Sequence, residues 1–110
     1  MDFDVHISEP AENDIGTAYR WWRDNRSAEQ ANRWFHEIHN AVATLSTMPL
    51  RCPRCEEEDL QEAGIRQLLF GIGRRPTHRI IFEIADNRVN ILRVRHVAQK
   101  PLEIDEIEQE

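Results

Sequence analysis

The sequence has little cysteine, little glycine and no long hydrophobic run, and each shortage excludes a class of protein. Its 110 residues include two cysteines, four glycines and one tyrosine. Two cysteines are too few for the disulfide framework of a small secreted domain. No apolar run approaches the roughly 20 residues of a membrane helix, and the first ten residues place acids where a signal peptide has basic and then apolar residues. We therefore expect a soluble, cytoplasmic protein without a membrane partner, with one domain over residues 1–110.

The charge is acidic overall but unevenly distributed. The formal net charge is −6, yet the segment from Gly64 to Lys100 holds eight basic residues and two acids, so its net charge is +6 and that of the remainder is −12. A local basic field attracts polyanions whatever the total charge. The alternative interpretation is a solvated sheet face whose arginines pair with acids from elsewhere in the chain.

Hydrophobic periodicity predicts one strand and then two helices in the first half of the chain. Residues 3–9 alternate with a period of two, which is typical of a half-buried strand. Apolar residues at helical spacing follow Pro10, and a second such stripe follows the capping sequence from Ser27 to Gln30 and stops at Pro49. The short connection between the two stripes predicts an antiparallel helical hairpin.

Three further strands are expected in the second half, over residues 65–71, 77–85 and 88–97. The pair Asp86-Asn87 between the last two is typical of a hairpin turn. The order β-α-α-β-β-β predicts an α+β fold, in which a helical hairpin packs on a mostly antiparallel four-stranded sheet. The acidic tail, residues 101–110, is expected to be frayed or to form a short helix.

Strand alternation also predicts a surface of arginines on the open face of this sheet, away from the helices. The arginines expected on this face, or in the loop at its edge, are Arg66, Arg74, Arg75, Arg79, Arg93 and Arg95. Such guanidinium groups can each donate two hydrogen bonds to a phosphate, so the surface is expected to bind nucleic acid or a partner protein. The alternative for Arg79 is an ion pair with Glu83. Alternation further places Leu92, Val94 and His96 under the helices and Val89 on the open face.

Cys52 and Cys55 raise the question of a metal site. His36 and His39 are the best candidates to complete a zinc site, but the helical spacing turns His36 away from the apolar stripe. We therefore expect no metal and no cofactor, and free thiols in a loop or with one of them tucked beneath it. Trp21 lies off the apolar stripe of its helix, so it either forms part of a partner surface or covers the edge of the core.

The segments IRQLLFG, THRIIFEIAD and VNILRVRHVAQ, in this order after a helical hairpin, resemble the RelE/ParE family of bacterial toxins. The resemblance extends from the first strand to about Pro101. It implies the toxin of a type II toxin–antitoxin system, which arrests growth when free and is silenced by an antitoxin. A RelE-like branch of the family cleaves mRNA in the ribosome, and a ParE-like branch keeps the fold but poisons DNA gyrase.

The resemblance implies only part of the ribonuclease machinery. Arg79 and Arg66 match basic residues that hold the scissile phosphate in RelE-like enzymes, and His96 falls close to a catalytic histidine, a general acid or base. A second lysine of that set falls near Leu68 and is missing, and Val97 stands where a tyrosine follows the histidine. The only tyrosine of the chain lies in the first predicted helix, so the tyrosine near the C-terminus of other relatives is absent as well.

We therefore expect a ParE-like toxin that poisons DNA gyrase, because the catalytic set is incomplete and the net charge is acidic. A ribosome-dependent mRNA endoribonuclease and a non-toxic interaction module of the same fold are the alternatives. The expected partners are a cognate antitoxin, bound in a hetero-oligomer, and either gyrase or the ribosome with its mRNA as the target.

Overall fold

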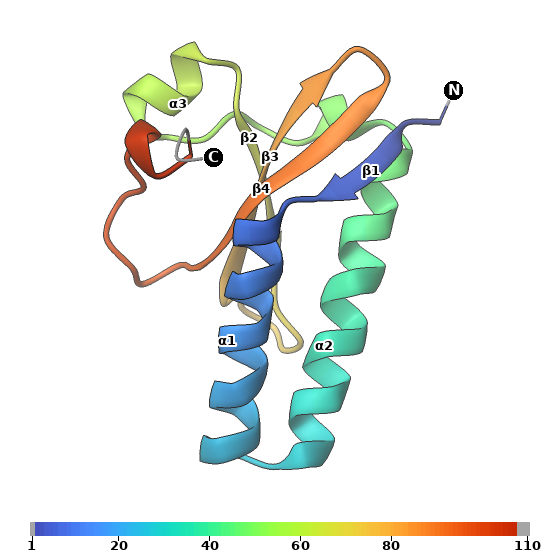
Figure 1. Ribbon diagram of the computed structural model, residues 1–110, viewed down its shortest axis with the longest axis vertical. Coiled ribbons are helices and arrows are strands. Elements are labelled where there is room, and N and C mark those ends of the chain that lie inside the picture. The colour runs from blue at the N-terminus through green and yellow to red at the C-terminus, as the bar shows by residue number, and fades with distance from the viewer. Residues whose placement is uncertain (1, 108–110) are drawn as a thin grey trace.

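The computed structural model describes residues 2–107 and shows a mixed four-stranded sheet with a helical hairpin on one face (Figure 1). The main elements in chain order are β1 (Asp4–Ile7), α1 (Glu9–Asn25), α2 (Ala28–Ala43), α3 (Glu58–Glu62), β2 (Arg66–Phe70), β3 (His78–Ala85) and β4 (Arg88–His96). Three short 3-10 helices lie in the connections: η1 (Thr44–Ser46), η2 (Pro49–Arg51) and η3 (Ile104–Glu106). The predicted α+β order is confirmed, and the short α3 is an addition to it.

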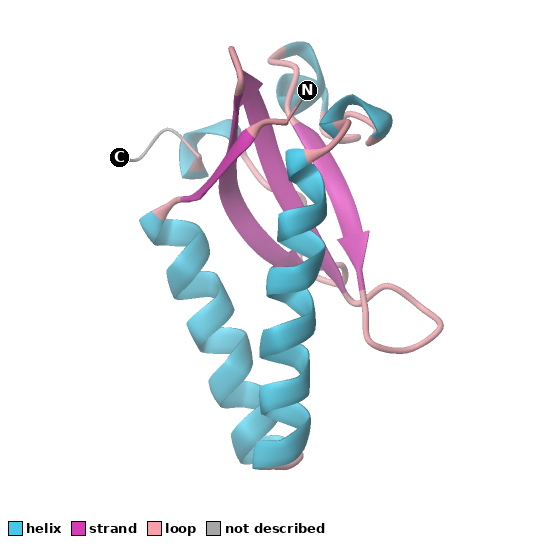
Figure 2. Cartoon of the chain, turned by 90° about the vertical axis from the view of Figure 1, so that its right-hand side faces the viewer, coloured by secondary structure: helices cyan, strands magenta, loops and turns pink. Residues whose placement is uncertain are grey.

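Both long helices begin at serines. The Ser8 hydroxyl accepts a hydrogen bond from the Ala11 N–H at 3.3 Å, and the Ser27 hydroxyl accepts one from the Gln30 N–H at 3.1 Å. Such N-caps satisfy donors that the first helical turn leaves unpaired. α2 ends at Ala43, before the predicted stop at Pro49, because the chain tightens into η1 there. The two helices lie on the same face of the sheet and extend past its end (Figure 2).

The strands are ordered β1-β4-β3-β2, with β1 parallel to β4 and the other two pairs antiparallel. The β3–β4 hairpin turns at Asp86-Asn87 as predicted, and Asp86 has the left-handed φ of 57° that a two-residue hairpin loop requires. Within residues 2–107, no helix combines the length and the hydropathy needed to cross a membrane.

A bulge in β4 changes which side chains face the helices. Ile81 pairs with Arg93 while Phe82 pairs with Ile91, so Leu92 is an extra residue in β4. Val89 therefore packs in the core under the helices, and Leu92 packs on the opposite face of the sheet. The predicted places of Val89 and Leu92 are wrong, because strict alternation fails at a bulge.

The sheet has a hydrophobic cluster on each face. The larger cluster lies under the hairpin and is centred on Trp34, Ile38 and Phe82, which are fully buried. The smaller cluster lies on the face expected to be open, and its buried members are Cys55, Leu60, Ile65, Ile81, Leu92 and Leu102. α3 and the chain after β4 therefore cover this second face, and they lie side by side in Figure 1.

The tail was expected to be frayed or to form a short helix. Leu102 is 3% exposed, and the 3-10 helix η3 follows it with Ile104 and Ile107 packed against the second cluster. Residues 108–110, the last part of that prediction, lie outside the described residues. The described part of the tail belongs to the folded domain because its apolar side chains bury the second face of the sheet.

Candidate functional site

The arginines expected on one open surface lie on both faces of the sheet. Arg79 and Arg95 are cross-strand neighbours on the face covered by α3 and the chain after β4. Arg66 lies opposite Phe82, on the side under the helices, and donates a 2.6 Å hydrogen bond to the Cys52 carbonyl. The prediction that Arg66 joins the other arginines is wrong, because Leu68 on the same side of β2 packs against the core under the helices.

Arg79 is held by an acid from the segment before α3. Its guanidinium donates two hydrogen bonds of 2.8 Å to the two carboxylate oxygens of Glu57, and its Nε donates one of 2.8 Å to Gln67 Oε1. The Arg79 and Glu57 side chains are only 13% and 14% exposed. Glu83, the expected alternative partner, instead accepts a hydrogen bond from Asn90.

Glu57 also holds the chain after β4. Its Oε2 accepts the Leu102 N–H at 3.0 Å, in addition to one of the Arg79 hydrogen bonds. Burial opposes ionisation of this carboxyl, but the hydrogen bonds from Arg79 and from the Leu102 N–H outweigh it and lower the pKa of Glu57 to about 2. Glu57 is therefore a carboxylate at every pH at which the protein would work.

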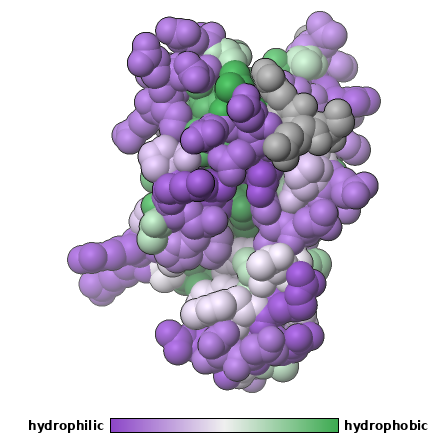
Figure 3. Space-filling model, turned by 60° about the vertical axis from the view of Figure 1, so that its left-hand side comes forward, coloured by the Kyte–Doolittle hydropathy of each residue, from purple (hydrophilic) through white to green (hydrophobic). Residues whose placement is uncertain are grey.

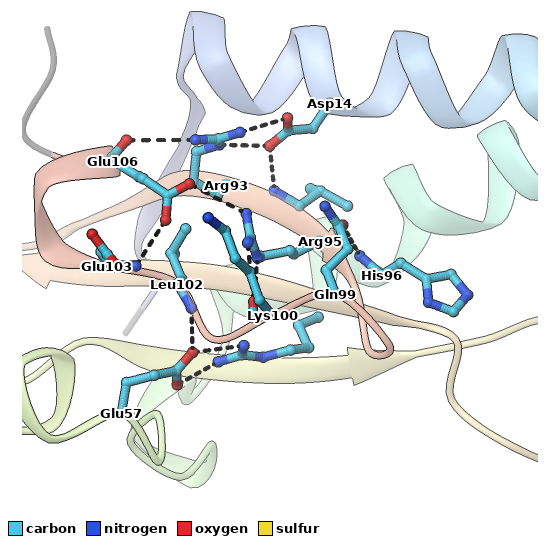
Figure 4. A network of polar contacts seen from close by, with 12 residues as sticks. Asp14, Glu57, Arg93, Arg95, His96, Gln99, Lys100, Leu102, Glu103 and Glu106 are labelled. Atoms are coloured by element: carbon cyan, nitrogen blue, oxygen red, sulfur yellow. Dashed lines mark hydrogen bonds and ion pairs between the residues drawn. The ribbon is translucent and has the colours of Figure 1, made fainter.

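The other two sheet arginines also have partners within the chain (Figure 4). Arg93 donates hydrogen bonds of 2.8 and 2.9 Å to the carboxylate of Asp14 on α1, which accepts the Val94 N–H at 3.0 Å as well. Arg95 donates two hydrogen bonds to the Lys100 carbonyl and lies 3.7 Å from the Glu106 carboxylate. The alternative interpretation is right that acids from elsewhere in the chain pair with the sheet arginines, but it is wrong that this face is solvated, because Arg79, Arg93 and Arg95 are largely covered.

His96 lies at the end of β4 on the side of the helices. It lines a cavity of about 550 Å³ between α1 and the ends of β3 and β4, together with Trp22 and His78. The His96 ring is exposed, lies 5.2 Å from the ring of His78, and accepts the Ala98 N–H at Nδ1. Burial, helped by the nearby His96, lowers the pKa of His78 to about 4, so His78 is neutral near pH 7.

Arg79 lies in a different cavity, of about 610 Å³, on the other face of the sheet. Glu57, Gln67, Leu69 and Val97 contribute to its walls. Figure 3 shows the side of the molecule that carries the chain after β4; it is largely hydrophilic and hollowed near its middle, where hydrophobic side chains form the floor. Of the three residues expected to act on one phosphate, Arg79 is thus separated by the sheet from Arg66 and His96.

The remaining expected binding residues are exposed. Trp21 is 50% exposed at the rim of the cavity that His96 lines, and the Arg26 guanidinium lies 5.6 Å from the centre of its ring. Arg74 and Arg75 are exposed in the loop between β2 and β3. These three side chains are therefore available to a partner, whereas Arg93 and Arg95 are engaged within the chain.

Comparison with models of protein families shows the family to which the chain belongs. Residues 5–101 match the family described as the ParE toxin of the type II toxin–antitoxin system parDE. The chain belongs to the ParE toxin family. The matched residues run from β1 to the chain after β4, so they include every element that carries an expected site residue.

Solved toxin structures share the fold of this ParE family member. A chain of the chromosomal ParDE toxin–antitoxin system from P. aeruginosa superimposes with a TM-score of 0.71 at 20% identity, over 86% of this chain and 96% of that chain. A chain of the toxin–antitoxin complex RelBE2 from Mycobacterium tuberculosis gives a TM-score of 0.60 at 23% identity, over 87% and 99%. A search of curated proteins gives no match. At these identities the likeness shows the fold alone.

The two cysteines of this ParE family chain are buried on opposite faces of the sheet. Cys52 belongs to the cluster under the helices and Cys55 to the second cluster, and both are free thiols. The expectation of free thiols is met, although both rather than one are covered. His36 is exposed on α2, and His39 lies 2.8 Å from the Phe35 carbonyl. Among residues 2–107, no three His, Cys, Asp or Glu side chains are grouped to hold a metal ion.

Both thiols are expected to react slowly in the folded ParE-family domain. Burial raises the pKa of Cys55 to about 11 and also raises that of Cys52, so little reactive thiolate forms near pH 8. A chromogenic disulfide reagent should modify both at least about tenfold more slowly in buffer than in guanidinium chloride. A thiol that reacts at the same rate in both solutions would contradict the burial.

Proposed function

We propose that the chain is the toxin of a type II toxin–antitoxin module and that it arrests growth in the cytoplasm by poisoning DNA gyrase. A cognate antitoxin bound along its surface silences it in a hetero-oligomer. Membership in the ParE toxin family supports the toxin assignment. The choice of gyrase over mRNA depends on the arrangement of the expected catalytic residues.

The observation that carries this choice is that Arg79 and His96 open into different cavities on opposite faces of the sheet. RNA cleavage requires a proton-transfer group and charge-stabilising donors within hydrogen-bonding reach of the same phosphate. Arg79 is already bound by Glu57, and Arg66 by the Cys52 carbonyl. The geometry therefore favours a toxin that acts by binding its target over one that cleaves RNA.

The exposed residues suggest where a partner protein would bind. Trp21 offers a large aromatic surface and Arg74 and Arg75 offer positive charge, while the acids of the chain lie largely outside the basic segment. An acidic, partly apolar antitoxin segment is complementary to such a surface. We therefore place Trp21, Arg74 and Arg75 in the partner-binding surface.

Two assays of the purified chain separate the candidate targets. With gyrase and plasmid DNA, we expect loss of supercoiling and accumulation of cleaved DNA; with translating ribosomes, we expect mRNA to stay intact. Codon-positioned cuts that vanish in Arg79→Ala would overturn the gyrase assignment in favour of a ribonuclease. Harmless expression without antitoxin, together with no effect in either assay, would show an inert interaction module and overturn the toxin assignment as well.

A further inference from the structure

The cavity beside α1 has aromatic rings on two sides. Trp21 and Trp22 line it from α1, and their rings meet edge to face, with centres 5.6 Å apart and planes at 89°. His78 and His96 line it from the ends of β3 and β4, with ring centres 5.2 Å apart and planes at 74°. A further aromatic ring can stack on one member of such a pair and meet the edge of the other, and both arrangements are favourable.

The described lining of this cavity presents no unpaired negative charge to an inserted group. Its one carboxylate, that of Asp14, already accepts hydrogen bonds from Arg93 and from the Val94 N–H. His78 is buried, and its pKa of about 4 keeps the ring neutral near pH 7. Ala18 and Val94 add apolar surface. The volume of about 550 Å³ lies in the range of small-molecule pockets, so an aromatic side chain fits.

The exposed rim of the cavity is rich in hydrogen-bond donors. The Arg26 guanidinium lies 5.6 Å from the centre of the Trp21 ring, and among residues 2–107 no carboxylate pairs with it. Because His96 Nδ1 accepts the Ala98 N–H, a neutral His96 ring carries its proton on Nε2 and can donate it from there. Gln99 Oε1 accepts the His96 N–H, which leaves the Gln99 amide NH2 group to donate. The rim therefore suits an acceptor with negative charge, such as a carboxylate.

We propose that this cavity receives an aromatic side chain of the antitoxin, and that acids next to this side chain bind Arg26 and His96 at the rim. The inference rests on the proposed toxin–antitoxin function and adds the anchor by which the antitoxin is selected. A buried aromatic anchor with polar contacts around it is typical of the residues that dominate protein–protein affinity. The anchor also covers Trp21, whose ring is half-exposed in the free chain.

A protein segment suits the cavity better than a nucleic acid. Arg26 is the one lysine or arginine in the described lining, and the Asp14 carboxylate lies in the same lining. A nucleic acid brings a negative charge with every nucleotide, and a chain with a net charge of −6 repels such a polyanion unless several basic residues meet it. A short segment with acids only beside its aromatic residue needs a single guanidinium.

Nuclear magnetic resonance on the isotope-labelled wild-type chain tests the cavity. The probe is a synthetic peptide with one phenylalanine between glutamates. The indole N–H signals of Trp21 and Trp22 are expected to shift and to saturate, whereas the Leu60 amide on the other face of the sheet should not move. Replacing the phenylalanine of the peptide by alanine, or its glutamates by lysines, should weaken binding about tenfold in each case.

Two pairs of variants locate the binding. Trp21→Ala should lower the affinity for the peptide about tenfold, whereas Phe35→Ala, at an exposed aromatic residue of α2 outside the lining, should leave it unchanged. Arg26→Gln should lower the affinity several-fold, and Arg33→Gln, which removes an exposed guanidinium from α2, should not. All four residues are exposed, so we expect the variants to fold.

Several outcomes overturn the proposal. No saturable shift at about 1 mM peptide, a concentration that detects even weak binding, would show that the cavity takes no such segment. Equal binding of the alanine or the lysine peptide would remove the aromatic anchor or the neighbouring acids from the recognition. An equal shift with oligothymidylate would assign the cavity to a nucleic acid, and a shift on concentrating the protein alone would assign it to a second copy of the chain. The gyrase and ribosome assays contain no peptide, so they test the toxin assignment separately.

Discussion

Acidification from about pH 6 to about pH 2 is expected to remove about 3 kcal/mol of unfolding free energy through Glu57 alone. The folded-state pKa of about 2 lies below the ordinary value of 4.5. Because the pKa is lowered by folding, the stabilisation is fully present above the ordinary value. It is lost as the pH falls from there through the folded-state value, because the proton then binds and the hydrogen bonds from Arg79 and the Leu102 N–H weaken.

Urea unfolding of the wild type and of Glu57→Gln at several pH values measures this contribution. At about pH 6 the variant should be less stable by about 3 kcal/mol, and near pH 2 the two proteins should be nearly equally stable, because a protonated glutamate resembles glutamine. Glu58→Gln serves as the control, since Glu58 is exposed at the start of α3. A stability difference that stays constant with pH would show that ionised Glu57 is not the source.

The second large expected effect is that of Asp14→Ala, which should lower the free energy of unfolding by about 3 kcal/mol. The Asp14 carboxylate joins α1 to β4 by accepting two hydrogen bonds from Arg93 and one from the Val94 N–H. The Asp14 and Arg93 side chains are 18% and 23% exposed, so the substitution leaves a mostly covered guanidinium and a backbone donor without their acceptor. The midpoint of urea unfolding should fall accordingly.

The chain supplies a matched control for this substitution. Asp24 forms an exposed pair with Arg23 at the end of α1, with side chains 61% and 48% exposed, so Asp24→Ala should change stability by less than about 0.5 kcal/mol. A double-mutant cycle between Asp14→Ala and Arg93→Met would isolate the energy of the pair itself. Equal losses for Asp14→Ala and Asp24→Ala would show that burial of the Asp14 pair contributes nothing.

Local patterns were sufficient for the two long helices, the four strands and the β3–β4 turn, but not for the short α3. Each of these features depends on residues that are close in sequence. The signals are the serine N-caps, the apolar residues at helical spacing, the alternation of apolar and polar residues in the strands, and the Asp86-Asn87 pair. Strict alternation misplaced Val89 and Leu92, since the one extra residue in β4 shifts the alternation before Arg93 and has no local signature here.

The site was harder to predict because its partners are distant in sequence. Glu57 precedes Arg79 by 22 positions and Asp14 precedes Arg93 by 79, so only the folded chain brings them together. Glu57 lies in a run of four acids, where nothing local distinguishes it from its neighbours. The second cluster was missed for a similar reason: Leu60 and Leu102 are apolar residues in acidic surroundings, and they are buried only in the cluster that the folded chain builds on the second face of the sheet.

The two clusters also differ in when they can form during synthesis. The core under the helices has its last buried member at Val94, whereas the second cluster needs Leu102. A chain that emerges from the ribosome N-terminus first can therefore close one face of the sheet before the other. Until the last residues emerge, Arg95 has neither the Lys100 carbonyl nor Glu106 beside it. A chain in which only the first cluster has formed thus has a more basic sheet face than the fully folded protein.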